Sequence, residues 1–302
     1  MASNSTLHNS KASRNDEFYT LYETVENELK HYGSHFRNRT IYCNCDDFRS
    51  SNFVKYFIDR FDEIGVRKLI ASCYSQDGKG FYYIKERGID TCGIFDGDGS
   101  FSSDECIKFL KEADVVVSNP PFSKMRDYLS MLEEHGKKYL FIGNMNAITY
   151  KEVYKLIQDN KLWLGITLTG LKCCFKVPEW YESKTTYEDG GVRYCRINNA
   201  IWFTNLDHDR RHDRIELQSV YDPYRHAHYD NFDGVNINKV ADIPSDYEGN
   251  MGVPITFLHR YNPDQFEIVR FRKGDDGKDL AYTQDGQTVQ PYFRIIIRKK
   301  KK

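Results

Sequence analysis

The four residues from Asn119 to Phe122, read as NPPF, combine groups that could hold an amino group. Each proline lacks an N–H and has a fixed φ, so the backbone after Asn119 is stiff. The Asn119 side chain and the Pro120 carbonyl can each accept a hydrogen bond, and Phe122 offers a flat apolar face beside them. Together these groups predict a site for a planar amine. The competing interpretation is a strand-to-loop turn with an incidental pair of prolines.

The apolar residues before this motif predict a buried strand, and similar segments recur along the first half of the chain. The predicted strands cover residues 39–45, 66–74, 114–118 and 137–143, and the predicted helices between them cover residues 51–65, 102–113 and 125–136. Strands that alternate with helices of this length favour an α/β fold with a doubly wound, mostly parallel sheet. Ligands of such sheets bind at the carboxyl ends of the strands, which is where Asn119 is expected.

Three sequence patterns predict where helices begin. Thr20 and Glu23 have the spacing of a capping box, which predicts a helix that runs toward Gly33, and Ser102 has the same spacing to an acidic residue. Asn262 followed by proline predicts another helix over residues 262–271. After about residue 165 helix signals become rare, and short strands are predicted in residues 166–170, 199–205, 252–259 and 292–297.

Composition and charge limit the class of protein. The chain has 302 residues, of which 40% are hydrophobic and 29% charged, enough for one large α/β domain or a core with an appendage. No apolar run approaches the roughly 20 residues that cross a bilayer, and the polar N-terminus lacks a signal region, so we expect an intracellular protein. The net charge of −1 does not mark the whole chain as a nucleic-acid binder, although residues 291–302 carry only basic charges.

The eight cysteines are scattered along the chain. Zinc sites usually contain paired C-x2-C or Cys/His blocks, which this sequence lacks. The spacing therefore predicts reduced cysteines in a reducing compartment and no metal site.

Several blocks together carry a resemblance to a known family. They are DEFYT (16–20), YCNCDD (42–47), LIASCY (69–74), NPPFS (119–123), GVPITFLH (252–259) and NPDQFE (262–267). The sequence resembles the EcoRI-type adenine-specific DNA methyltransferases. That resemblance implies the Rossmann-like fold of S-adenosylmethionine-dependent methyltransferases, and transfer of a methyl group to N6 of an adenine flipped out of duplex DNA. It assigns catalysis to Asn119, Pro120, Pro121 and Phe122, with Asn119 and Pro120 holding N6.

The resemblance also indicates residues for the methionine end of the cofactor. Phe18, Tyr19 and Thr20 match an N-terminal motif that lines this end of the cofactor. Asp46, followed by Phe48, matches the motif after the first strand and implies a carboxylate for the cofactor amino group. Both glycines of that family motif are replaced here, by Ser50 and Asn52. Residues 46–52 are therefore also compatible with an ordinary acidic helix cap.

The adenine end of the cofactor is expected at the loop FDGDGSF, residues 95–101. The resemblance implies Asp96 or Asp98 as acceptor for the adenine amine and Phe101 along its ring. An ordinary surface turn is the alternative, because Asp-Gly is a common turn signal. The ribose partner cannot be assigned, since the second strand ends in Ser-Cys-Tyr without an acidic residue.

The expected organisation is a disordered segment 1–15, a catalytic core 16–165, and a target-recognition region 166–302 that also contributes to the core. Base-edge readers are Arg, Lys, Asn and Gln. In the irregular, His-rich part of this region the arginines are DNA-contact predictions, with solvated side chains as the alternative: Arg210, Arg211, Arg214 and Arg225. Double-stranded DNA is the expected partner. The resemblance suggests a monomer in the cytoplasm of a bacterium or phage-infected cell, either in a restriction-modification system or as an orphan enzyme.

Two other functions remain open from the motif. Ribosomal RNA guanine-N2 methyltransferases also carry NPPF, and their chemistry is of the same type. A DNA-binding remnant of the fold without activity is compatible with the replaced glycines. The intact NPPF sequence favours an active enzyme.

Overall fold

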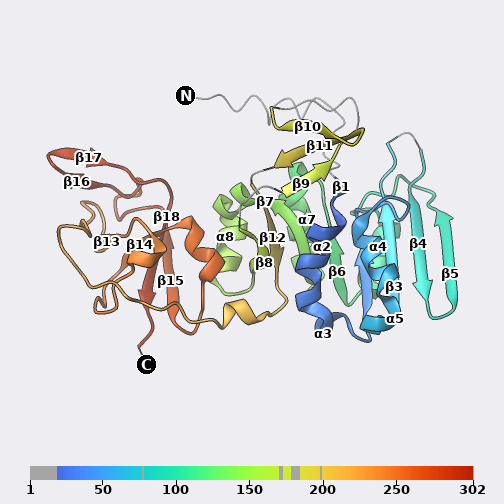
Figure 1. Ribbon diagram of the computed structural model, residues 1–302, viewed down its shortest axis with the longest axis horizontal. Helices are drawn as coiled ribbons and strands as arrows, with labels where there is room; N and C mark the ends of the chain where they lie inside the picture. Colours follow the sequence, from blue (N-terminus) through green and yellow to red (C-terminus); the bar gives the residue numbers. More distant parts are fainter. Residues whose placement is uncertain (1–18, 77, 170–172, 178–183, 198, 302) are drawn as a thin grey trace. The chain divides into compact units, whose positions relative to one another are not determined.

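The computed structural model describes residues 19–301 except 77, 170–172, 178–183 and 198, so the expected disordered segment 1–15 lies outside it. The chain forms two compact units (Figure 1). The first comprises the chain up to Val153 together with Leu164–Leu206. The second comprises Tyr154–Trp163 and Asp207–Lys302.

An eight-stranded sheet forms the centre of the first unit. Its strands, in spatial order, are β5 (Ile89–Ile94), β4 (Phe81–Glu86), β3 (Lys68–Cys73), β2 (Thr40–Cys43), β6 (Val115–Ser118), β7 (Lys138–Asn144), β12 (Ala200–Thr204) and β8 (Trp163–Thr169). The four central strands are parallel, while β4, β5 and β12 pair antiparallel to their neighbours. The four strands predicted for the parallel core and their doubly wound, mostly parallel arrangement are confirmed. The strand predicted over residues 252–259 is wrong in its second half, because Ile255–Arg260 forms a 3-10 helix.

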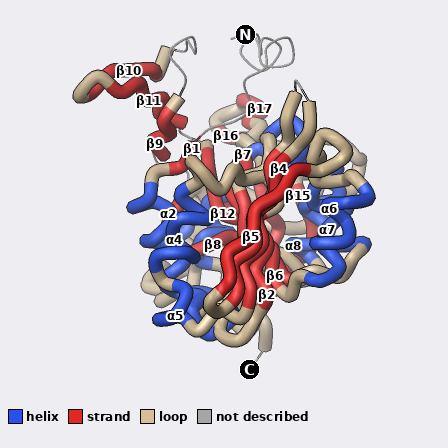
Figure 2. The backbone as a smooth tube through the Cα atoms, turned by 90° about the vertical axis from the view of Figure 1, so that its right-hand side faces the viewer, coloured by secondary structure: helices blue, strands red, loops and turns tan. Residues whose placement is uncertain are grey.

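Helices cover both faces of this sheet. They are α2 (Tyr22–Leu29), α3 (Gly33–Phe36), α4 (Asn52–Asp59), α5 (Phe61–Ile64), α6 (Asp104–Glu112) and α7 (Met125–Glu134); α8 (Lys151–Gln158) follows β7. Figure 2 shows α2, α4 and α5 on one side of the sheet and α6 and α7 on the other. Helix α4 forms because its apolar residues share one face, and its buried Phe53 meets Trp202 of β12 edge-on at 5.7 Å.

The order of the central strands creates a topological switch point between β2 and β6. Strand β2 has β3 on one side and β6 on the other, so the chain leaves β2 in one direction and later returns on its opposite flank. Crossovers that diverge in this way open a crevice at the carboxyl ends of the two strands. The residues after β2 and the NPPF motif after β6 meet there.

Two predicted helix starts are wrong. Thr20 does not cap α2, whose N-cap is Leu21 without a side-chain hydrogen bond. Thr20 instead belongs to β1 (Tyr19–Thr20), which pairs antiparallel with the distant strand β9 (Cys173–Lys176). This pairing holds the backbone of Thr20 in an extended conformation. For α6 the cap is Ser103 rather than Ser102, and its hydroxyl accepts a hydrogen bond from the amide of Cys106.

Two hairpins of the first unit were not predicted. Strands β4 and β5 form one of them at the edge of the large sheet. Strands β10 (Thr186–Asp189) and β11 (Val192–Ile197) form the other and extend the sheet that contains β1 and β9. Gly190 and Gly191 occupy positive φ in the turn of the second hairpin, a conformation that most other residues avoid.

The second unit is built mainly from strands. Its sheet contains β13 (Val235–Asn236), β14 (Met251–Pro254), β18 (Arg294–Lys299) and β15 (Phe266–Phe271), and β16 (Tyr282–Gln284) pairs with β17 (Gln287–Val289). The helix predicted from Asn262 is wrong. Asn262 holds a tight turn through a 2.7 Å bond from the amide of Asp264, and the chain then enters β15, which pairs with β18. Phe266 and Ile268 alternate inward with the period of a strand.

Candidate active site

Asp46 joins the loop after β2 to the start of the NPPF motif. Its carboxylate accepts hydrogen bonds from the Ser51 hydroxyl at 2.7 Å and the Ser118 hydroxyl at 2.6 Å, and a longer one from the Asn119 amide at 3.4 Å. Ser118 Oγ also accepts from the backbone amide of Cys45 at 3.1 Å. One carboxylate thus fixes the carboxyl ends of β2 and β6 against each other.

The electrostatics of Asp46 follow from its burial. The side chain is only 5% exposed, and burial raises the pKa of Asp46 above its ordinary value, while the bonds from Ser118, Ser51 and Asn119 oppose that rise. Its amide is also used, because it donates to the carbonyl of Ser72 in β3 at 2.9 Å. The predicted cofactor carboxylate therefore lies at the crevice but is already engaged with neighbouring hydroxyls.

The NPPF motif forms a rigid turn directly after β6. Pro120 is buried, Asn119 and Pro121 are half-buried, and Phe122 packs against the core cluster of the first unit. Phe122 also begins a short 3-10 helix, in which the amide of Lys124 donates to the Pro121 carbonyl at 2.9 Å. The Pro121 carbonyl therefore accepts a hydrogen bond within the turn, and the Pro120 carbonyl lies one residue before that bond.

The replaced glycines of the first motif have structural roles. The amides of Ser50 and Ser51 both donate to the carbonyl of Asp47, at 3.0 and 2.7 Å, which makes the tight turn before α4. The Asn52 amide nitrogen donates to the carbonyl of Thr20 at 2.7 Å and so fixes β1 beside this turn. Of the two replacements, Asn52 makes a side-chain contact that glycine could not make, whereas Ser50 contributes a backbone bond that glycine could also form.

Two buried polar atoms at this edge of the sheet lack hydrogen-bond partners among the described residues. The hydroxyl of Thr20 and the amide nitrogen of Asn44 are buried and make no hydrogen bond within the described part of the chain. Unsatisfied buried donors carry a free-energy cost, so they are positions where a bound ligand can supply the missing partner. Phe18 and the side chain of Tyr19 lie outside the described residues.

Asn44 and Tyr128 were not singled out from the sequence. The Tyr128 hydroxyl donates to Asn44 Oδ1 at 2.7 Å, which orients the amide, and the Phe101 ring meets Tyr128 edge-on at 5.3 Å. Asn44 lies within the YCNCDD block, so its place after a buried strand was the available signal. Tyr128 carried none, because its position in α7 reads as an ordinary core residue.

The expected adenine loop is held at the end of β3. Its backbone is bound by Glu105, which accepts from the amides of Asp96 and Gly97 at 3.0 and 2.9 Å, and the Asp98 carbonyl accepts from the Ser75 amide at 2.8 Å. The Asp96 side chain is fully exposed and lies 3.3 Å from Lys79, whereas Asp98 Oδ1 accepts from the Ser100 amide at 2.9 Å.

Phe48 has a packing role in the structure. Its ring stacks on Tyr83 of β4 at 5.1 Å with an interplanar angle of 16°, and it packs against the same core cluster as Phe122. Arg49 lies over the neighbouring Phe81 ring at 4.7 Å. The stack attaches the turn after β2 to the edge hairpin.

The four arginines predicted to contact DNA all lie in the second unit but differ in environment. Arg211 is buried, binds Asp207 at 2.8 Å and Asn160 at 2.7 Å, and stacks over the Trp163 ring, so its guanidinium is used inside the unit. Arg210 and Arg214 are closer to the surface. Arg225 lines a pocket and lies 3.6 Å from Asp242.

No helix among the described residues is both long and apolar enough to cross a membrane.

Comparison with known proteins places the chain in a family. The family model described as adenine-specific methyltransferase EcoRI matches residues 6–91 and 84–300. The chain is 47% identical to type II methyltransferase M.EcoRI of Escherichia coli, over 99% of this chain and 98% of that protein. It is 35% identical to M.MgeORF184P of Mycoplasma genitalium and 34% identical to M.MpnI of Mycoplasma pneumoniae, in each case over 96% of this chain and 97% of the relative. The chain is therefore a methyltransferase and belongs to the EcoRI adenine-specific methyltransferase family.

Proposed function

We propose that this protein transfers the methyl group of S-adenosylmethionine to N6 of adenine in duplex DNA, as the modification enzyme of a type II system. The observation that carries the proposal is the position of the NPPF turn. It lies at the crevice between β2 and β6 and is held there by the bonds of Asp46 to Ser118 and Asn119. Family membership supports the same substrate.

The residues at this crevice suit the polar end of the cofactor. The Thr20 hydroxyl and the Asn44 amide nitrogen are buried, lack partners in the described part of the chain, and lie at the same edge of the sheet as Asp46. A ligand with both carboxylate and ammonium groups can satisfy atoms of these types. We assign Thr20, Asn44 and Asp46 to the amino-acid end, and the loop with Asp98 and Phe101 to the adenine end.

The chemistry needs positioning more than acid–base catalysis. When bound, S-adenosylmethionine would supply a methyl group on a positively charged sulfur. Attack of the amine nitrogen on that methyl carbon would break the carbon–sulfur bond, leave the sulfur as a neutral thioether and release one proton from N6. The oxygens of Asn119 and Pro120 accept the N–H groups of the target amine, which aims its nitrogen and raises its electron density. The fixed φ of the prolines keeps both acceptors in place, so little reorganisation is needed during the reaction. Phe122 offers a ring face for the base, which must leave the helix because N6 is inaccessible inside the stack.

The test measures the methylated product directly. Unmethylated duplex DNA is incubated with the protein and S-adenosylmethionine, digested to nucleosides and analysed by mass spectrometry. We expect N6-methyladenine from the wild type and at least about a hundredfold less from Asn119→Ala, because one oriented acceptor is lost from the transition state. Asn27→Ala, which removes the same side chain from α2, is expected to retain wild-type activity.

Parallel measurements separate the proposal from its alternatives. Structured RNA is offered under the same conditions, and cofactor binding is followed by calorimetry. A methylated guanine in RNA with unmodified DNA would refute the DNA substrate. Failure of the wild type to bind S-adenosylmethionine would indicate a remnant of the fold and refute the enzyme.

A further inference from the structure

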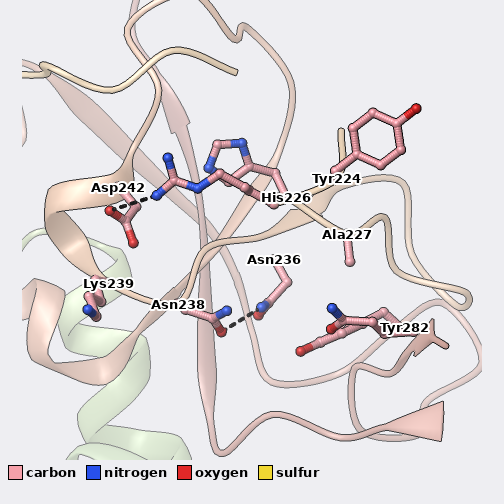
Figure 3. Close-up of a pocket in the computed structure, with 10 residues that line it drawn as sticks. Tyr224, His226, Ala227, Asn236, Asn238, Lys239, Asp242 and Tyr282 are labelled. Atoms are coloured by element: carbon pink, nitrogen blue, oxygen red, sulfur yellow. Dashed lines mark hydrogen bonds and ion pairs between the residues drawn. The ribbon is translucent and has the colours of Figure 1, made fainter. Parts of the chain in front are cut away.

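The second unit contains a pocket that the methyl-transfer site does not use. Its volume is about 370 Å³, and its walls come from the segment before β13, the residues after β13 and the hairpin β16–β17. Figure 3 shows His226, Asn236, Asn238 and Asp242 gathered around it, while the Tyr224 ring points away. The size is that of a small-molecule site.

A buried histidine offers one donor to this pocket. His226 is 2% exposed, and its Nδ1 accepts the backbone amide of Asp222 at 3.1 Å. A neutral imidazole that accepts at Nδ1 carries its proton at Nε2. Nε2 has no hydrogen-bond partner in the described part of the chain, although it is buried at the pocket wall. An unmet buried donor of this kind indicates that a ligand acceptor belongs beside it.

A hydrogen-bond network orients a second donor. Asn236 Nδ2 donates to Asn238 Oδ1 at 2.9 Å, and Arg294 donates to the same oxygen at 3.4 Å. Because Arg294 can only donate, the atom of Asn238 that faces it is the oxygen, and the Asn238 amide nitrogen is directed elsewhere as a donor. Asn236 itself is held by Tyr229 and Arg294, which bond to its oxygen at 3.0 and 2.9 Å.

The charges of the pocket favour an anion. Arg225 and Lys239 line it, against the single carboxylate of Asp242, which lies 3.6 Å from Arg225. Four donor groups and one spare positive charge match the several acceptor oxygens of a phosphate. The buried Tyr282 ring adds an apolar surface next to these donors, which suits the sugar or base attached to such a phosphate.

We propose that this pocket binds one nucleotide unit, with its phosphate held by Arg225, Lys239, His226 and Asn238. The nucleotide can come from two sources. The first is a nucleotide of the bound DNA strand, and for this source the inference rests on the proposed function. A free nucleotide carries the same chemistry and is the second source. The experiment below distinguishes the two.

The first arm measures binding of fluorescently labelled duplex DNA as a function of NaCl. Lys239→Ala is expected to weaken binding about fivefold near 150 mM salt and to reduce the slope of log Kd against log salt by about one, as for one lost phosphate contact. Asn238→Ala should weaken binding with the slope unchanged, because it removes a neutral donor. The control Lys278→Ala removes the same charge from an exposed turn of this unit and should alter neither quantity.

The second arm titrates the protein with deoxyadenosine monophosphate and with deoxyadenosine by calorimetry. Binding of the monophosphate alone, lost in Lys239→Ala and competing with DNA, supports a strand nucleotide as the ligand. Binding that is lost in Lys239→Ala while DNA affinity is unchanged in every variant supports a free nucleotide. Unchanged DNA affinity together with no monophosphate binding would overturn the proposal.

Circular dichroism and thermal unfolding of each variant show that a lost signal does not reflect misfolding. The more conservative His226→Gln retains a donor and should bind more tightly than His226→Ala. The methylation assay keeps this inference separate from the proposed function. If the wild type forms no N6-methyladenine but binds the monophosphate through Lys239, the proposed function fails and the pocket stands.

Discussion

At the scale of single residues, the candidate site depends on a carboxylate that is used to build the site. Asp46 binds two hydroxyls and one amide, which join β2, α4 and β6 at the crevice. Its burial makes the charged form costly, so the hydrogen bonds from Ser51 and Ser118 are needed to offset that cost. This arrangement also fixes the position of Asn119, because Asn119 directly follows Ser118 in the chain and its own amide binds Asp46.

The raised pKa of Asp46 predicts a pH-dependent stability. When the pKa of a carboxyl is higher in the folded than in the unfolded state, the folded protein loses stability as pH rises from the unfolded-state pKa through the folded-state pKa. We therefore expect the free energy of unfolding of the wild type to fall relative to Asp46→Asn as pH rises from about 4. Urea unfolding of both proteins across this range measures the difference. A difference that does not vary with pH would show that the Asp46 pKa is not raised.

At the scale of elements, a buried glutamate attaches α2 to the edge strand β8. Glu28 is fully buried and accepts from the amides of Ile166 and Thr167 at 2.8 and 2.7 Å, and from the Tyr32 hydroxyl at 2.8 Å. Gly165 makes this approach possible, because a Cβ at that position would collide with the Glu28 carboxyl and lie 2.5 Å from Cβ of Trp202. The helix and the strand thus need a glutamate and a glycine at matched positions.

Removal of this attachment is expected to be costly. Glu28→Ala leaves two half-buried amides of β8 without their acceptor and should lower the free energy of unfolding by about 3 kcal/mol. Gly165→Ala should destabilise by a comparable amount, because the added methyl group forces the carboxyl away. Glu23→Ala, an exposed position on the same helix, should change stability by less than about 0.5 kcal/mol. Urea unfolding measures all three, and a Glu28→Ala protein as stable as the wild type would refute the role of the contact.

At the scale of the whole molecule, the two units differ in their construction. The first is a sheet covered by helices on both faces, and the second is a small sheet with long irregular segments that hold buried polar residues. Among these is His259, which is 7% exposed and whose Nδ1 lacks a partner in the described chain. Burial, with a smaller effect from Arg210, lowers the pKa of His259 to about 4.

This histidine predicts that the second unit is sensitive to acid. When folding lowers the pKa of a group, its full contribution to stability is present at pH values above the unfolded-state pKa, here 6.5. That contribution is lost as pH falls from there through the folded-state pKa of about 4. The loss should reach about 3 kcal/mol at most. His259→Gln should remove most of this dependence. Hydrogen exchange of the β15 and β18 amides at several pH values measures it, and equal acid sensitivity of both proteins would contradict the assignment.

The amino-acid sequence determined the features that depend on local pattern. Strands and helices of the parallel core follow from apolar periodicity, and NPPF at the end of β6 follows from the residues themselves. The resemblance to the EcoRI-type family is confirmed, because blocks of adjacent residues carry it. Their functional assignments, from Thr20 and Asp46 to Arg225, remain proposals.

Tertiary structure decided the features that depend on distant partners. Thr20 pairs with β9 instead of capping α2, and residues 266–271 pair with β18 instead of forming a helix. Arg211 reads as a surface cation in the sequence but stacks on Trp163 inside the second unit. In each case a contact between residues far apart in the chain outweighs the local preference, which is worth only about 1 kcal/mol or less for each residue. Periodicity and motifs depend on residues close together in the sequence, whereas strand pairing and burial depend on contacts that form only when the chain folds.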